Sequence, residues 1–172
     1  MARLPYLKLE QMPERTQELL KKMVSPELNL YKIVAHAEDS IRHFIRMGSS
    51  LLTQNKLDDN LRELVILRVA TLSNSHYEWI QHKRIAAGIG VPEEKIEGVR
   101  LGPENEAFNE RERLVLQFTD EVVTRIKASQ ATFDAVSKYL DHREIVELIL
   151  AIGYWSMVAR LLESTEVELE DE

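Results

Sequence analysis

Residues 61–72 have the sequence LRELVILRVATL, and this stretch decides the fold prediction. Its apolar side chains recur at intervals of three and four residues, which is the period of an α-helix. The charged residues within it are Arg62, Glu63 and Arg68. The preceding residues 57–60, LDDN, supply side chains that can cap a first helical turn. A helix this apolar is expected to lie at the centre of the molecule.

The same spacing of apolar residues runs through most of the chain, and only six Gly and five Pro interrupt it. No stretch has the alternating pattern of a β-strand. Helices are therefore expected over residues 13–23, 25–52 with a break near 37–39 or 48, 61–72, 76–87, 109–125 and 145–162, with short ones after 91 and 129. The acidic end, residues 163–172, is expected to fray. The sequence predicts a single all-α domain over residues 1–172.

The composition is that of an ordinary globular protein, with 44% apolar and 30% charged residues in a chain of 172. The apolar stretches fall short of the ~20 residues of a membrane-spanning helix, and the first residues lack a secretory signal pattern. A cytoplasmic protein without membrane contact is expected. A net charge of −7 with scattered basic residues argues against nucleic-acid binding. The absence of cysteine excludes disulfides, thiolate metal sites and peroxidatic thiols.

A second stretch, residues 76–82, reads HYEWIQH and places Glu78 and His82 four residues apart on one helical face. A carboxylate and an imidazole at this spacing can hydrogen-bond, and partial burial would tune both groups for acid–base chemistry near neutral pH. Glu63, on the preceding helix, could hold a second proton. The same spacing is also common on ordinary solvated helices, so a purely structural pair is the alternative.

The neighbouring residues also have two interpretations. Arg68, inside an apolar helix, needs a carboxylate partner, which is either a structural ion pair or a substrate anion. Trp79 fits a core position or a pocket wall. Oxygen and nitrogen metal ligands are present, but no zinc motif such as HExxH occurs, so no metal is expected. The glycines at 88 and 90 follow a helix instead of a strand, which excludes a dinucleotide-binding loop.

Four stretches together resemble the carboxymuconolactone decarboxylase family, within the alkylhydroperoxidase-D-like superfamily. They are RELVILRVA at 62–70, YEWIQH at 77–82, AGIGVP at 87–92 and ERERLVLQF at 110–118. The likeness spans about residues 28–169 and includes GYWSMVARLL at 153–162, so that residues 1–27 form an amino-terminal extension and 163–172 an acidic tail. The resemblance implies an alkylhydroperoxidase-D-like helical bundle that assembles as a homo-oligomer such as a trimer or hexamer.

In the peroxidase branch of that superfamily, a Glu is followed by a Cys-x-x-Cys pair and then a His, which relay protons to a redox disulfide. Glu63 and His82 match this Glu and this His, whereas Ser75 and Glu78 stand at the two cysteine positions. A peroxide-reducing cycle through a disulfide therefore cannot run in this chain. The Glu-Trp-x-x-His pattern at 78–82 is similar to the cysteine-free decarboxylases of the family.

The resemblance implies a cofactor-free decarboxylase, or a related acid–base enzyme, acting on a small unsaturated or cyclic organic acid. His82, coupled to Glu78, would be the acid–base group, and Glu63 would complete the relay. The residues expected to bind the substrate are Arg68, Tyr77, Trp79 and Ser75, with Arg68 orienting the leaving carboxylate. Two alternatives stay open: a noncatalytic oligomeric helical protein, and a metal- or peroxide-handling protein that lacks the redox cysteines.

Overall fold

A computed structural model describes residues 2–23 and 25–170, and every regular element within them is a helix. A 3₁₀ turn at Leu9–Gln11 precedes the α-helices. These are α1 (Glu14–Leu20), α2 (Asn29–Val34), α3 (Ile41–Thr53), α4 (Asp59–Leu72), α5 (His76–Gly88), α6 (Glu93–Leu101), α7 (Glu110–Arg125), α8 (Gln130–Val136) and α9 (His142–Thr165). The expected all-α fold is confirmed.

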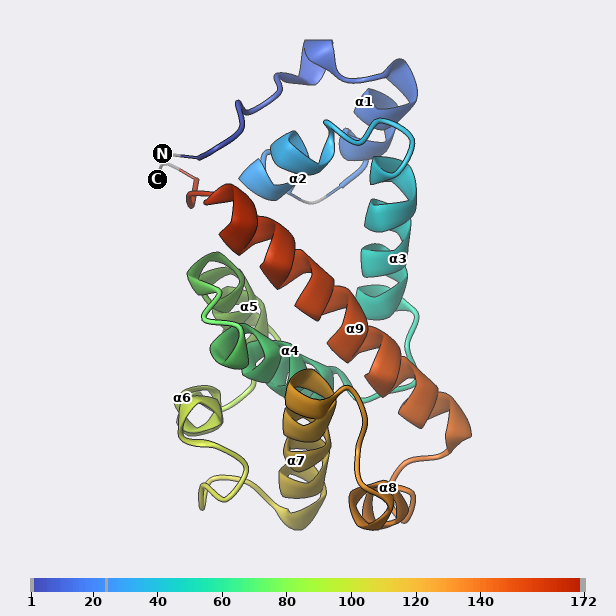
Figure 1. The fold of residues 1–172 in the computed structure, drawn as a ribbon, viewed down its shortest axis with the longest axis vertical. Coiled ribbons are helices and arrows are strands. Elements are labelled where there is room, and N and C mark those ends of the chain that lie inside the picture. Colours follow the sequence, from blue (N-terminus) through green and yellow to red (C-terminus); the bar gives the residue numbers. More distant parts are fainter. Residues whose placement is uncertain (1, 24, 171–172) are drawn as a thin grey trace.

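Helix α4 lies at the centre of the bundle, as its apolar sequence predicts (Figure 1). Asp58 caps it by accepting a hydrogen bond from the backbone N–H of Leu61 at 2.9 Å. Residues 61–70 are all buried, because α5, α6, α7 and α9 pack around the helix. The charged side chains within this stretch must therefore find partners inside the protein.

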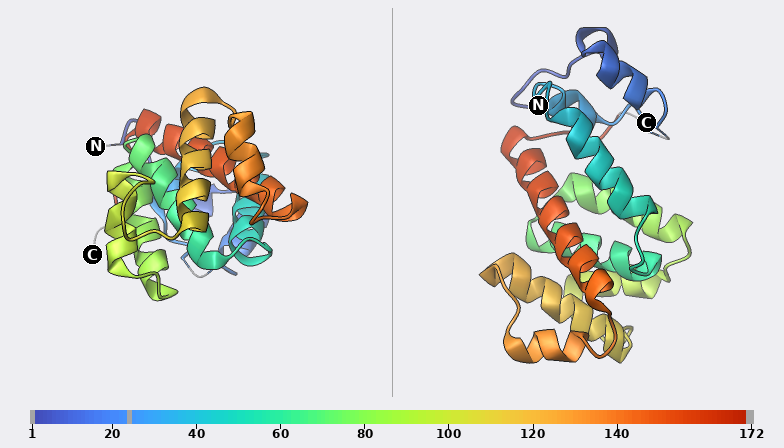
Figure 2. Two further views of the ribbon diagram at one scale, coloured as in Figure 1. Left: turned by 90° about the horizontal axis from the view of Figure 1, so that it is seen from below. Right: turned by 90° about the vertical axis from the view of Figure 1, so that its right-hand side faces the viewer.

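Helix α9 runs diagonally along the molecule and contacts both of its ends (Figures 1 and 2). It begins at a capping box formed by Asp141 and Glu144 and is longer than the expected range of 145–162. The helix is long and apolar enough to cross a membrane, with a mean hydropathy of 1.7 over its apolar stretch. No stretch of this length and composition is expected from the sequence analysis. However, 56% of the apolar stretch of α9 is buried inside the bundle, as is typical of a core helix.

Helices α1 and α2 lie at one end of the molecule, α6, α7 and α8 lie towards the other, and α3 runs from the first end along the side of the bundle (Figures 1 and 2). The expected break in the second helical region lies between α2 and α3, at residues 35–40, and Gly48 continues α3. Met12 and Leu20 pack against Ile41 and Ile45 in a small separate core. The amino-terminal segment thereby holds α3 alongside α9.

The amino-terminal segment contacts the end of α9. The backbone N–H of Arg3 donates to the carbonyl oxygen of Thr165 at 2.8 Å, and the Arg3 guanidinium pairs with Glu166 at 2.7 Å. Val167 and Leu169 pack against the main core. The expectation that the acidic end frays is therefore wrong for residues 163–170, while positions 171 and 172 lie outside the described residues.

Candidate functional site

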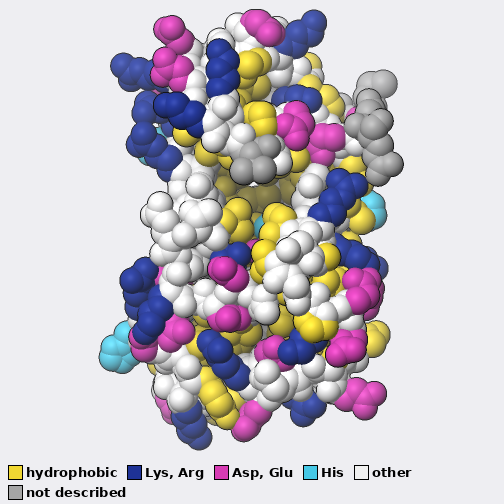
Figure 3. All heavy atoms as spheres, turned by 180° about the vertical axis from the view of Figure 1, so that it is seen from behind, with side chains coloured by type: hydrophobic (Ala, Val, Ile, Leu, Met, Phe, Trp, Pro, Cys, Tyr) yellow, Lys and Arg dark blue, Asp and Glu magenta, His cyan; other side chains and the backbone are white. Residues whose placement is uncertain are grey.

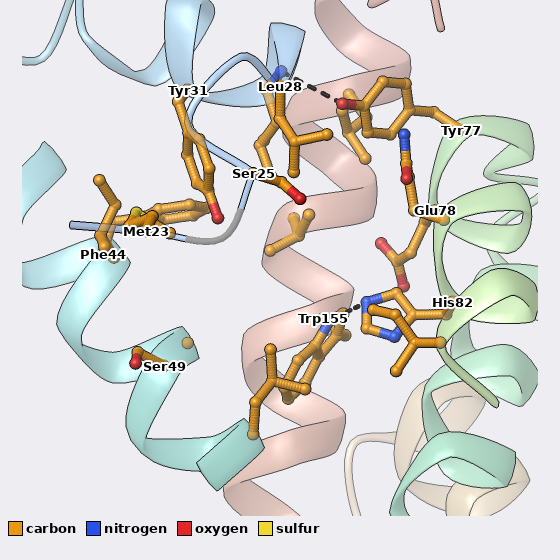
Figure 4. A pocket seen from close by; sticks show the side chains of 18 of the residues that line it. Met23, Ser25, Leu28, Tyr31, Phe44, Ser49, Tyr77, Glu78, His82 and Trp155 are labelled. Atoms are coloured by element: carbon orange, nitrogen blue, oxygen red, sulfur yellow. Dashed lines mark hydrogen bonds between the residues drawn. The ribbon is translucent and has the colours of Figure 1, made fainter. Parts of the chain in front are cut away.

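A cavity of about 750 Å³ lies between α3, α5 and α9. Figure 3 shows a hollow with hydrophobic side chains around it on the back of the molecule, and Figure 4 shows the cavity from close by. Its wall is mainly apolar and aromatic, with Phe44 and Leu52 from α3 and Tyr154, Trp155 and Val158 from α9. Helix α5 contributes the polar side chains of Tyr77, Glu78, Gln81, His82 and Arg84.

His82 makes hydrogen bonds through both of its ring nitrogens. Its Nδ1 lies 2.8 Å from Oε2 of Glu63 on α4, and its Nε2 accepts a hydrogen bond from the indole N–H of Trp155 at 2.8 Å. The sequence-based expectation that Glu63 and His82 come together is confirmed. The Trp155 contact was not expected, although a buried indole N–H generally needs an acceptor.

These contacts fix the protonation state of the imidazole. An indole N–H can only donate, so Nε2 of His82 must carry a lone pair. The ring proton therefore sits on Nδ1 and is donated to Glu63. His82 is thus a neutral imidazole in a single tautomer, and the Trp155 ring packs edge-on against it at a centroid distance of 5.5 Å.

Glu63 is fully buried and has partners for both carboxylate oxygens. Its Oε2 accepts from His82, and its Oε1 accepts from Nε of Arg62 at 3.1 Å. Arg62, itself buried, also pairs with Asp59 in the first turn of α4. The result is a continuous hydrogen-bonded chain from Asp59 to Trp155, which satisfies the charges that α4 brings into the core.

Glu78 is in the opposite situation. It is 2% exposed, and neither of its carboxyl oxygens has a hydrogen-bond partner among the described residues. Burial, together with the negative charge of Glu163 nearby, raises the pKa of the Glu78 carboxyl well above its ordinary value. This setting favours the neutral acid over the carboxylate, and the side chain points into the cavity between Tyr77 and His82 (Figure 4).

The expected hydrogen bond between Glu78 and His82 is therefore wrong. The two ring nitrogens of His82 form hydrogen bonds with Glu63 and Trp155, and the carboxyl oxygens of Glu78 have no hydrogen-bond partner among the described residues. Helical spacing placed the two residues on one face of α5, but it could not show that another helix supplies better-aligned partners.

Arg68 is held away from the cavity. Its Nε and Nη2 donate to the two carboxylate oxygens of Asp120 on α7 at 2.6 and 2.8 Å, and its Nη1 donates to the carbonyl oxygen of Val99 at 2.7 Å. This bidentate pair corresponds to the structural interpretation of Arg68. The expectation that it orients a substrate carboxylate in the cavity is not supported by this geometry.

Of the other residues expected to bind the substrate, only Tyr77 lines the cavity. Its hydroxyl donates to Glu170 at 2.6 Å, and burial and this carboxylate raise the pKa of the Tyr77 hydroxyl. Ser75 and Trp79 are buried but line a second, smaller pocket on the other side of the first turn of α5. Within residues 2–23 and 25–170, no group of three or more His, Asp or Glu side chains is arranged to hold a metal ion.

Glu170 was missed by the sequence analysis because the tail was expected to fray. Its carboxylate also accepts from Nε2 of Gln81 at 2.7 Å and from the backbone N–H of Asn29 at 2.6 Å. Glu170, Tyr77 and Gln81 all line the cavity. No sequence signal near Glu170 indicates this position, because it depends on where α9 ends.

Comparisons with known proteins agree with the fold. A family model described as the carboxymuconolactone decarboxylase family matches residues 38–121. A peroxidase-related protein of Ralstonia eutropha JMP134, described as an alkylhydroperoxidase AhpD core, aligns with a TM-score of 0.87 over 99% of this chain and 93% of its own, at 16% identity. A peroxidase-related protein of Silicibacter sp. TM1040 gives 0.84 over 98% and 92%, at 17% identity.

A third similar structure is a cysteine-to-alanine variant of the debrominase Bmp8 in complex with 2,3,4-tribromopyrrole, with a TM-score of 0.80 over 99% of this chain and 94% of that one, at 15% identity. No curated protein matches the sequence. At these identities the structural likeness establishes the fold alone. Residues 38–121 thus match the model of the carboxymuconolactone decarboxylase family, and the chain, which contains no cysteine, has the alkylhydroperoxidase-D-like fold.

Proposed function

We propose that this protein is a cofactor-free acid–base enzyme in which Glu78 is the proton donor. The observation that carries the proposal is a buried carboxyl group with no partner, facing a mainly apolar cavity. A carboxyl with a raised pKa is suited to general acid catalysis near neutral pH. Leaving such a group unpaired costs stability, and such costs are concentrated at functional sites.

The reaction we propose is loss of carbon dioxide from a small unsaturated or cyclic organic acid, or a related proton transfer. The bond between the carboxylate carbon and the adjacent carbon of the substrate breaks, and carbon dioxide leaves. The electron pair of that bond moves into the unsaturated part of the substrate. Glu78 then donates its proton to the resulting carbanion-like carbon, becomes a carboxylate, and is reprotonated from solvent. The charge of that carboxylate is unfavourable in the apolar wall, which favours reprotonation between turnovers.

His82 has a different part in this proposal from the one that its sequence position indicated. A neutral imidazole whose nitrogens are both engaged is poorly placed to exchange a proton with a substrate. We assign it to the wall beside Glu78, where the bonds to Glu63 and Trp155 keep its ring in one orientation. Glu63 correspondingly acts through His82 and does not line the cavity.

The test is turnover of carboxymuconolactone and related small unsaturated acids by the purified protein. Replacing Glu78 by Gln keeps the shape of the side chain and removes the proton, so kcat is expected to fall by about 10²–10⁴-fold. Glu27→Gln is the matched control, because Glu27 also lines the cavity but is exposed, and it should retain activity. Equal turnover by the wild type and Glu78→Gln would remove Glu78 from the proposal.

A second candidate is binding of a small neutral aromatic molecule without catalysis. It is supported by the apolar wall of the cavity and by the debrominase, whose structure holds 2,3,4-tribromopyrrole. Calorimetric titration of the wild type with halogenated pyrroles tests it. Saturable binding of these compounds, together with no turnover of any unsaturated acid, would favour this candidate over the decarboxylase.

A further inference from the structure

A second pocket, of about 270 Å³, lies at the N-terminal end of α5. It is lined by Ala70, Thr71, Asn74, Ser75, His76, Trp79 and Arg100. The main cavity shares none of these residues, so the two sites lie on different sides of the first turn of α5. Glu63, Glu78 and His82 do not line this pocket.

The charge of this pocket is unlike that of the protein as a whole. The chain has a net charge of −7, yet the lining of the pocket includes one guanidinium, one imidazole and no carboxylate. The Arg100 guanidinium lies over the Trp79 ring at 4.0 Å from the ring centre, which holds it against the pocket wall. Its ion pair with Glu97 is long, at 3.8 Å, so the positive charge is only weakly compensated.

Two sets of hydrogen-bond donors face the same end of the helix. The first turn of α5 presents backbone N–H groups that the side chain of the N-cap residue, Ser75, does not cap. Ser75 is 1% exposed, and its hydroxyl has no partner within the described part of the chain. A buried hydroxyl beside uncapped N–H groups lacks an acceptor, and a bound oxyanion would provide one.

We infer that this pocket is a binding site for a small oxyanion, either a carboxylate or a phosphate group. Arg100 supplies the charge, the Ser75 hydroxyl and the first N–H groups of α5 supply the donors, and Trp79 supports the guanidinium. The positive end of the helix dipole adds to the attraction. Because the site is separate from the cavity that contains Glu78, it can be occupied whether or not the proposed reaction takes place.

The experiment is a ¹⁵N NMR titration of the full chain with sodium phosphate and, separately, with sodium acetate, at constant ionic strength. Saturable shifts are expected for the backbone N–H groups of His76, Tyr77 and Glu78 and for Nε of Arg100. The anion that saturates at the lower concentration identifies the site as phosphate- or carboxylate-binding. Shifts that rise linearly with both anions, or that spread over the exposed basic residues, would overturn the inference.

Variants separate this site from general charge effects. Arg100→Gln is expected to weaken binding by about tenfold, and Ser75→Ala by a smaller factor, because each removes one donor to the anion. Arg125→Gln removes the same charge from an exposed position at the end of α7 and should bind like the wild type. An unchanged affinity in Arg100→Gln would also overturn the inference, since this side chain is exposed enough for the variant to fold normally.

Discussion

Two buried glutamates, Glu63 and Glu78, differ in their hydrogen-bond partners and therefore in the chemistry that each can perform. Glu63 has hydrogen bonds to both oxygens, from Arg62 and His82, whereas Glu78 has none. The sequence predicted that Glu63 and His82 meet, because the family pattern fixes their relative positions. It could not predict the state of Glu78, since this depends on the partners of His82 and on how α9 covers α5.

The pKa of Glu78 predicts a pH-dependent stability. The folded protein keeps the proton above the ordinary carboxyl pKa of 4.5, while the unfolded chain releases it, so the unfolded state is favoured as pH rises. Relative to Glu78→Gln, the wild type should lose up to about 1.4 kcal/mol of unfolding free energy per pH unit in this window. Denaturant unfolding of both proteins from pH 4 to pH 8 measures the difference, and parallel curves would contradict a raised pKa.

The contacts of His82 predict its tautomer. At neutral pH its ring proton should be on Nδ1, with a lone pair on Nε2, because the Trp155 indole N–H donates to Nε2. ¹⁵N NMR of histidine-labelled protein distinguishes the two nitrogens, and His43 and His142, which are exposed, serve as internal references. A proton on Nε2, or on both nitrogens, is incompatible with the structure described above.

At the scale of the elements, hydrophobic periodicity predicted each helix well and helix ends less well. Helices α4 and α5 match their expected ranges within two residues, because capping residues and Gly90, with a φ of +88°, mark their ends. Helix α9 continues past its expected end at 162, since its last turn packs against the amino-terminal segment. Contacts between distant segments of this kind leave no periodic signal in the sequence.

The approach of α3 to α9 depends on Gly48. A Cβ atom at this position would lie 2.5 Å from the hydroxyl oxygen of Tyr154, which is itself held by the carbonyl of Phe44 at 2.9 Å. Gly48→Ala should therefore lower the unfolding free energy by about 1–3 kcal/mol. Gly153→Ala is the control: its Cβ would meet nothing within 4 Å, so it should stabilise α9 by up to about 1 kcal/mol. Thermal unfolding that ranks Gly48→Ala at or above the wild type would refute this packing.

At the scale of the whole molecule, α9 has apolar residues on its outer face as well as in the core. Val146, Ile149, Leu150 and Met157 are exposed at helical spacing along it. We propose that this face contributes to the homo-oligomer that the family resemblance implies, because a row of exposed apolar side chains is typical of an interface.

Sedimentation equilibrium tests this proposal. The wild type should sediment with the mass of a trimer or hexamer, and Leu150→Glu should shift the protein toward smaller species because a charge on the apolar face would be buried on assembly. Arg143→Gln, at an exposed polar position of the same helix, also lowers the net charge by one and controls for the change of charge. A wild type that sediments as a monomer at micromolar concentration would rule the interface out.

The protonation state of Glu78 is the claim on which the proposed function rests, and it can be measured directly. In ¹³C NMR spectra of glutamate-labelled protein, one side-chain carboxyl carbon should keep the chemical shift of the neutral acid at pH 7, and this resonance should be missing from Glu78→Gln. If instead every glutamate resonance moves to the carboxylate position below about pH 5, near the ordinary Glu pKa, then Glu78 is ionised at neutral pH and cannot be the proton donor.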